Sequence, residues 1–224
     1  MAAPRTWIIG AIVGLGIAVA RLDAGGWAVV TMGEVPDHMV EGRPVTVTYS
    51  VRQHGVSLTP GLSGHIEARS ESGVIVKARA SAGGEPGFYV ATLTLPAPGT
   101  WTLTIVSGFL SSQSAPVPMR VIAVKDRSPQ LADADRGARL FAAKGCVMCH
   151  SHVAVPAPPG FAPNLSIPRF APAFLKAFLA DPSIKPRTMP NAEMPDLGLN
   201  DDEISALVAF LSTPPNASNA VASR

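Results

Sequence analysis

Charged side chains are scarce in this chain of 224 residues: they make up 15% of it, and the formal net charge is +2. A strongly basic surface, the usual footprint of a nucleic-acid-binding protein, is therefore not indicated. Apolar residues account for 47% of the sequence, which is typical of a folded protein and too much for a disordered one. A chain of this length accommodates two domains, each with its own core.

Long apolar runs are limited to one, at residues 6–20, which follows a short basic start. As a helix, this run reaches roughly 22 Å, short of the ~30 Å hydrocarbon core of a membrane. Small residues at 18–20 suit a signal peptidase, so residues 1–20 are interpreted as an export signal. The alternative is an uncleaved anchor, lengthened by residues 22–30, that associates with the membrane. Either interpretation predicts a periplasmic location or the extracytoplasmic face of the cell membrane.

Cysteine is absent between residues 26 and 124, which excludes an internal disulfide bridge there. This region instead shows apolar residues at every second position, the period of a strand with one buried face. Seven such segments, separated by glycine and proline, lie at residues 27–32, 45–51, 65–69, 74–79, 89–95, 101–105 and 118–124. Their number and spacing predict an immunoglobulin-like sandwich of two antiparallel sheets, held together by hydrophobic packing alone.

Two of these segments, residues 89–95 and 101–105, are separated by little more than Pro96-Ala97-Pro98-Gly99. Proline and glycine at this density are typical of a turn. We therefore expect the two strands to pair as a hairpin.

Short motifs occur throughout this region, at residues 26–30, 35–36, 42–44, 51–55 and 96–101. Together they resemble a family of small extracytoplasmic immunoglobulin-like modules called YtkA-like. The resemblance covers most of residues 26–124. It implies a fold and a compartment, and it implies no activity.

The only two cysteines stand in the motif Cys146-Val147-Met148-Cys149-His150, which is C-x-x-C-H. This spacing lets Cys146 and Cys149 add to the two vinyl groups of one haem while His150 reaches the iron. A structural zinc site needs further ligands, and only His152 lies nearby. A thioredoxin-like pair would open a helix, whereas this pair follows a helix that begins near residue 134. The motif therefore predicts one covalent haem c.

A polar segment with a central proline, residues 125–133, is interpreted as a linker. The predicted fold class is thus multidomain, with an N-terminal all-β immunoglobulin-like sandwich followed by an all-α domain. The expected divisions are residues 1–20 (signal or anchor), 21–124 (sandwich), 125–133 (linker), 134–213 (haem domain) and 214–224 (tail).

Helical signals surround the haem motif. Gly137 and Phe141 lie four positions apart on the preceding helix and so share a face. Asn200 and Glu203 have the spacing of a capping box, which opens a last helix running to about Leu211. Between them, residues 170–180 predict a short helix with an apolar face.

These features resemble the class I cytochrome c family, in which the first and last helices cross and close the haem crevice. The resemblance implies that Gly137 permits a close approach of the two helices and that Phe210 lies near Phe141. It also implies that the middle helix packs against the macrocycle.

The resemblance extends to the iron ligands. It implies that the carbonyl of Pro163 accepts a hydrogen bond from the imidazole of His150, the proximal ligand. Met194 matches the sixth ligand, since Pro, Leu-x-Leu and an acidic helix start follow it as in the family. Met189, which also precedes a proline, remains an alternative, as does an open coordination position.

Iron held by histidine on one side and methionine on the other has no vacant position. The sequence therefore predicts a one-electron carrier of moderately high potential, and no enzyme. The expected partner is a redox protein or a respiratory complex, with no nucleic acid and no small-molecule substrate.

Three alternatives remain open. The sandwich is the functional part in one of them and binds copper through some of His38, Met39, His54 and His65, although no H-x-H or M-x-x-M cluster is present. Another is a haem enzyme or gas sensor, which requires a weak or missing methionine ligand. The last is an accessory subunit of an oxidase-type complex, with the sandwich as its docking module.

Overall fold

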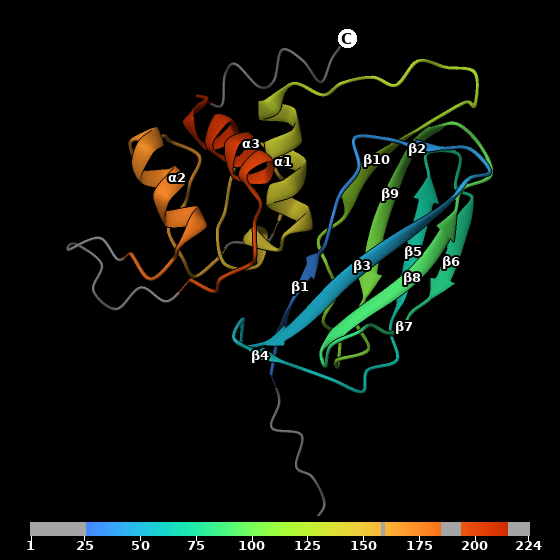
Figure 1. The fold of residues 1–224 in the computed structure, drawn as a ribbon, viewed down its shortest axis with the longest axis horizontal. Coiled ribbons are helices and arrows are strands. Elements are labelled where there is room, and N and C mark those ends of the chain that lie inside the picture. The colour runs from blue at the N-terminus through green and yellow to red at the C-terminus, as the bar shows by residue number, and fades with distance from the viewer. Residues whose placement is uncertain (1–25, 158–159, 185–193, 215–224) are drawn as a thin grey trace, which may run out of the picture.

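The computed structural model describes residues 26–157, 160–184 and 194–214. They form a β-sandwich followed by a group of helices that packs beside it (Figure 1). Within these ranges no helix is both long enough and apolar enough to cross a membrane. The predicted export signal and Met189 lie outside the described residues.

Two five-stranded sheets make up the sandwich. The first has the order β1–β3–β8–β7, with β4 also paired to β3; the second has the order β2–β10–β9–β5–β6. The first sheet contains β1 (Ala28–Met32), β3 (Pro44–Gln53), β4 (Ser57–Leu58), β7 (Ser81–Ala82) and β8 (Phe88–Thr94). The second contains β2 (Met39–Val40), β5 (His65–Ser70), β6 (Ile75–Arg79), β9 (Gly99–Val106) and β10 (Val117–Ile122).

The seven strands of five residues or more each overlap one of the predicted segments. On β9 the side chains of Trp101, Leu103 and Ile105 are buried between the sheets, while the intervening threonines are half-buried. A stacked pair, Tyr49 and Tyr89, packs in the same core with ring centroids 5.2 Å apart. The predicted all-β N-terminal domain is therefore confirmed.

The predicted hairpin is wrong. Strand β8 pairs with β3 and β7, whereas β9 pairs with β5 and β10 in the other sheet. The segment between them crosses the sandwich: Leu95 is still buried, and the indole N–H of Trp101 donates to the carbonyl of Ala97 at 3.0 Å. Alternation in a sequence fixes which face of a strand is buried, but it does not fix the neighbouring strand.

Three α-helices follow β10: α1 (Asp133–Ala143), α2 (Pro172–Ala180) and α3 (Asp201–Ser212). The predicted capping box opens α3, since the side chain of Asn200 accepts from the Glu203 amide at 2.9 Å and the Glu203 carboxylate accepts from the Asn200 amide at 3.2 Å. Helix α2 starts two residues later than expected because Pro172 occupies its first position, where a missing N–H is harmless.

Helices α1 and α3 cross at Gly137. A Cβ atom at this position would overlap the carbonyl oxygen of Ala206 and the Cβ of Phe210. One turn further along α1, the ring of Phe141 lies 5.7 Å from that of Phe210. The close approach of the two helices and the neighbouring phenylalanines are thus confirmed.

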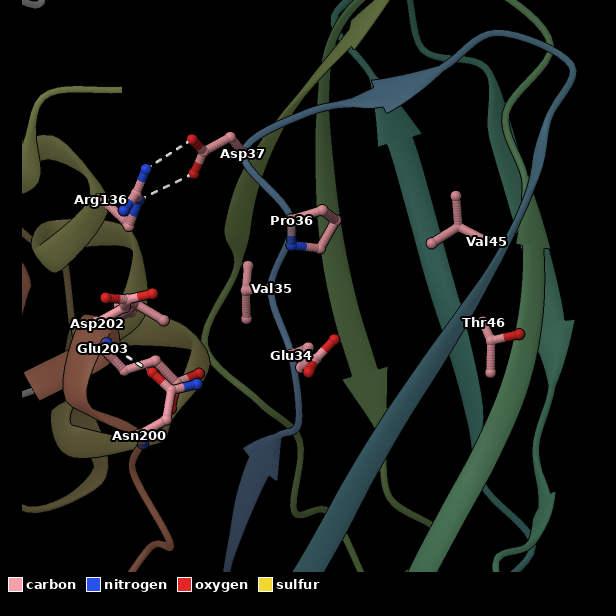
Figure 2. A pocket seen from close by; sticks show the side chains of 11 residues that line it. Glu34, Val35, Pro36, Asp37, Val45, Thr46, Arg136, Asn200, Asp202 and Glu203 are labelled. Carbon is pink, nitrogen blue, oxygen red and sulfur yellow. Dashed lines mark hydrogen bonds and ion pairs between the residues drawn. The ribbon is translucent and has the colours of Figure 1, made fainter. Parts of the chain in front are cut away.

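The helical domain and the sandwich meet along α1 and the segments that follow β1 (Figure 1). Figure 2 shows Asp37 facing Arg136 of α1, with a distance of 2.8 Å between the guanidinium and the carboxylate. Arg139, one turn further along α1, lies 3.2 Å from the same carboxylate, so two guanidinium groups share it. Lys144, only 3% exposed, donates to the carbonyl of Gly33 at 2.6 Å and pairs with Glu203 at 2.6 Å. This junction positions the functional site.

Candidate functional site

The C-x-x-C-H motif forms a tight turn directly after α1. Gly145 adopts a left-handed conformation with φ of 80°, which ends the helix and starts the short 3-10 helix η1 (Cys146–Met148). The amide of His150 then donates to the carbonyl of Cys146 at 2.8 Å. As a result, Cys146, Cys149 and His150 all line one cavity.

That cavity has a volume of about 760 Å³, which lies in the range of cofactor sites. The helical domain contributes the motif, Phe161, Ala162 and the segment that starts at Met194. The sandwich contributes the opposite part of the lining, namely Trp27, Val29, Arg52 and residues 54–56. The site is therefore built by both domains.

His150 is held in the form that a metal ligand requires. Its Nδ1 atom lies 2.9 Å from the carbonyl oxygen of Pro163. Since a carbonyl can only accept, Nδ1 carries the hydrogen and Nε2 keeps its lone pair. Burial lowers the pKa of His150, against the opposing effect of the hydrogen bond to Pro163, so the imidazole is neutral at pH 7.

The two cysteines of the motif are at least half-buried, and this burial sets their protonation. Burial raises the pKa of Cys146 to about 12 and raises the pKa of Cys149 as well. Redox-active and metal-binding C-x-x-C pairs need the thiolate, which their surroundings favour by lowering the pKa. Burial shifts the pKa of Cys146 and Cys149 in the opposite direction, so both thiols keep their proton at neutral pH.

Met194 is half-buried and lines the cavity together with His150. The rival sixth ligand, Met189, lies outside the described residues. A neutral imidazole with a free lone pair, two thiols and a thioether sulfur, all in one partly apolar cavity, fit the donor set of haem c.

The residues of the copper hypothesis do not assemble in the same way. Met39 is buried in the core of the sandwich, His65 lies on β5, and His54 follows β3. Among the described residues, no group of three or more His, Cys, Asp or Glu side chains is arranged to hold a metal ion.

Sequence reasoning missed the part of the site that the sandwich contributes. Trp27, Arg52 and His54 line the cavity from the sandwich, and no local pattern marks such a contact between domains. His152, considered only as a zinc ligand, is a buried side chain between Phe141 and Phe210.

The helical fold and the C-x-x-C-H turn define the class of this region as a haem-based electron-transfer domain. A family model described as cytochrome c matches residues 134–214. The C-terminal part of the chain is thus a cytochrome c domain, with the covalent haem c and the electron-carrying role that this domain implies. The predicted multidomain fold class is confirmed.

Other comparisons are weaker. Similar solved structures include the Lin-41 filamin domain, at 16% identity and TM-score 0.34 over 42% of this chain and 91% of that one. Salmonella alpha-2-macroglobulin shows 15% identity and TM-score 0.36 over 50% of this chain and 7% of that one. Superoxide reductase (neelaredoxin) from Ignicoccus hospitalis shows 16% identity and TM-score 0.28 over 41% of this chain and 80% of that one. No curated protein matches the chain.

Proposed function

We propose that this protein is an extracytoplasmic electron carrier with one haem c and His/Met axial ligation, which exchanges single electrons with a respiratory complex. One observation carries the proposal: Cys146, Cys149, His150 and Met194 line the same cavity, with the imidazole of His150 held by Pro163. The export signal interpreted at residues 1–20 and the YtkA-like motifs of the sandwich support the compartment.

Attachment would use the two cysteines in their thiol form. Cys146 and Cys149 would each add S–H across one vinyl group, with sulfur joining the carbon next to the ring and hydrogen joining the outer carbon. No atom or electron is lost, so no oxidant is needed. Both cysteines are free in the structure, as this addition requires.

The axial positions would be filled by His150 and Met194. The Pro163 carbonyl fixes the ring of His150, which offers Nε2, and Met194 offers its thioether sulfur. A haem held by these residues would supply one-electron chemistry between the ferrous and ferric states. Thioether ligation and apolar side chains such as Val29 and Phe161 disfavour the extra charge of the ferric state, so we propose a moderately high reduction potential.

The test is an absorption spectrum of the full-length holoprotein and of two methionine variants. Met194→Ala should lose the weak long-wavelength band of sulfur-ligated ferric iron and should bind carbon monoxide when reduced. Met189→Ala, the matched control, should keep the band and stay closed to carbon monoxide. Loss of the band in Met189→Ala alone would move the ligand to Met189, and carbon monoxide binding by the unaltered protein would refute a pure electron carrier.

A further inference from the structure

The sandwich supplies a wall of the cavity through two segments that are adjacent in the first sheet. Val29 lies on β1 and Trp27 directly precedes that strand, while Arg52 comes from the end of the neighbouring strand β3. The chain then turns at His54 and Gly55, both left-handed with φ of 53° and 76°. This turn keeps His54 beside the cavity as well.

Trp27 joins the two domains at the rim of the cavity. Its ring lies 5.6 Å from that of Phe161, edge to face, and 6.1 Å from that of His54. Phe161 belongs to the helical domain and is otherwise exposed. Below this aromatic contact, a Cβ atom on Gly145 would meet Cγ1 of Val29 at 2.7 Å, so β1 packs directly on the start of the haem motif.

Arg52 brings a positive charge into this wall. Its side chain is half-buried, and Nη1 donates to the hydroxyl of Ser50 at 2.6 Å. Burial lowers the pKa of Arg52, while the nearby charge of Asp196 opposes that effect. The other cation of the lining, Lys144, forms an ion pair with Glu203. Among the described residues, Arg52 has no carboxylate at ion-pair distance.

An arginine side chain stays protonated even when half-buried. Its charge therefore acts on any group in the cavity whose own charge changes, and it does so more strongly than a fully exposed charge because the Arg52 side chain is half-buried. A cation beside an iron centre disfavours the ferric state, which carries one more positive charge.

We infer that the β-sandwich is part of the haem site itself, in which Arg52 raises the reduction potential of the haem and Trp27 closes the rim of its crevice. The inference rests on the proposed function. It gives the sandwich a role within the electron carrier that requires no activity of its own.

The test compares midpoint potentials of the full-length holoprotein and its variants. Arg52→Met should lower the potential and shift the equilibrium with a one-electron mediator by about tenfold, equivalent to about 59 mV. Arg52→Lys should retain most of the potential because it keeps the charge. Arg79→Met, on strand β6 at the far edge of the other sheet, removes the same charge and should leave the potential unchanged.

Trp27 gives an independent readout. Trp27→Ala should make reduction of the ferric protein by a small soluble reductant severalfold faster, with an unaltered haem spectrum. If Arg52→Met does not load haem, Arg52→Gln, which keeps a donor for Ser50, replaces it in the comparison.

The outcomes separate the two proposals. Unaltered protein without a haem spectrum would refute the proposed function. A normal spectrum combined with equal potentials in Arg52→Met and Arg79→Met would overturn this inference alone, as would a Trp27→Ala variant reduced no faster than the unaltered protein.

Discussion

His152 is buried without a full set of hydrogen bonds. The residue is 4% exposed, and its ring lies 4.2 Å from that of Phe210 and 5.9 Å from that of Phe141. Nδ1 accepts from the amide of Ala154 at 3.1 Å, while Nε2 finds no hydrogen-bond partner among the residues that the structure describes. Packing against the two aromatic rings and one backbone hydrogen bond hold this imidazole in place.

Burial lowers the pKa of His152 from its ordinary 6.5. The unfolded chain therefore takes up a proton at a higher pH than the folded one, so the contribution of His152 to stability is complete above about pH 6.5 and is lost as the pH falls through the lowered folded pKa. We predict that His152→Phe, which keeps the aromatic stack, flattens the fall in unfolding free energy between pH 7 and pH 5. Denaturant unfolding at both pH values measures this; an unchanged slope would show that His152 does not titrate in this range.

At the scale of elements, the crossing of α1 and α3 depends on Gly137, which has no side chain to separate the two helices. The atoms that an added Cβ at Gly137 would meet are the backbone of Ala206 and the Cβ of Phe210, neither of which can rotate away. The two helices would have to separate to make room. This distinguishes Gly137 from a glycine that only interrupts a helix.

We predict that Gly137→Ala destabilises the domain by roughly 1–3 kcal/mol, although alanine favours a helix by about 1 kcal/mol over glycine. Thermal unfolding measures the change. Gly84→Ala is the matched control, because a Cβ there meets no atom within 4 Å. A Gly137→Ala variant as stable as the unaltered protein would show that the helices tolerate a wider crossing.

Elements that depend on neighbouring residues were predictable from the sequence. The Asn200–Glu203 capping box and the C-x-x-C-H turn are local, and the alternating segments correctly marked the seven longer strands. The partners of β8 and β9 were not predictable, because each strand lies beside one that is distant in the sequence, β3 for β8 and β5 for β9. For the same reason Trp27 and Arg52 could not be assigned to the cavity from the sequence, since only the docking of the domains places them there.

At the scale of the whole molecule, the two domains are joined by buried charges. Arg139, whose side chain is 6% exposed, binds both the carboxylate and the backbone carbonyl of Asp37, and Arg136 binds the same carboxylate. Lys144 ties the haem motif to Gly33 and to Glu203 of α3. The wall that the sandwich gives to the cavity depends on this docking.

Burial alone would raise the pKa of Asp37, but the hydrogen bond and charge of Arg136 and the charge of Arg139 lower it overall. The interaction of Asp37 with the two arginines therefore contributes its full stabilisation above the unfolded pKa of about 3.9. This stabilisation is lost as the pH falls through the lower folded pKa of Asp37. We predict that Asp37→Asn reduces stability by about 2 kcal/mol at pH 7, because it leaves Arg139 buried without a carboxylate.

Unfolding of Asp37→Asn is compared with that of Glu71→Gln, which removes the same charge from an exposed turn. Equal stabilities of the two variants would contradict a docking role for Asp37. The difference between Asp37→Asn and the unaltered protein should also shrink below about pH 3.9, where Asp37 of the unfolded chain takes up a proton while the lowered pKa keeps the folded carboxylate charged.

The central claim, a haem bound covalently to Cys146 and Cys149, is tested most directly by the intact mass of the full-length protein under denaturing conditions. The protein is produced in cells whose haem-attachment system matures a known c-type cytochrome. We predict the mass of the chain plus one haem, and the mass of the chain alone when both cysteines are replaced by serine. An unaltered protein that carries no haem, while the reference cytochrome from the same cells is fully loaded, would contradict the account.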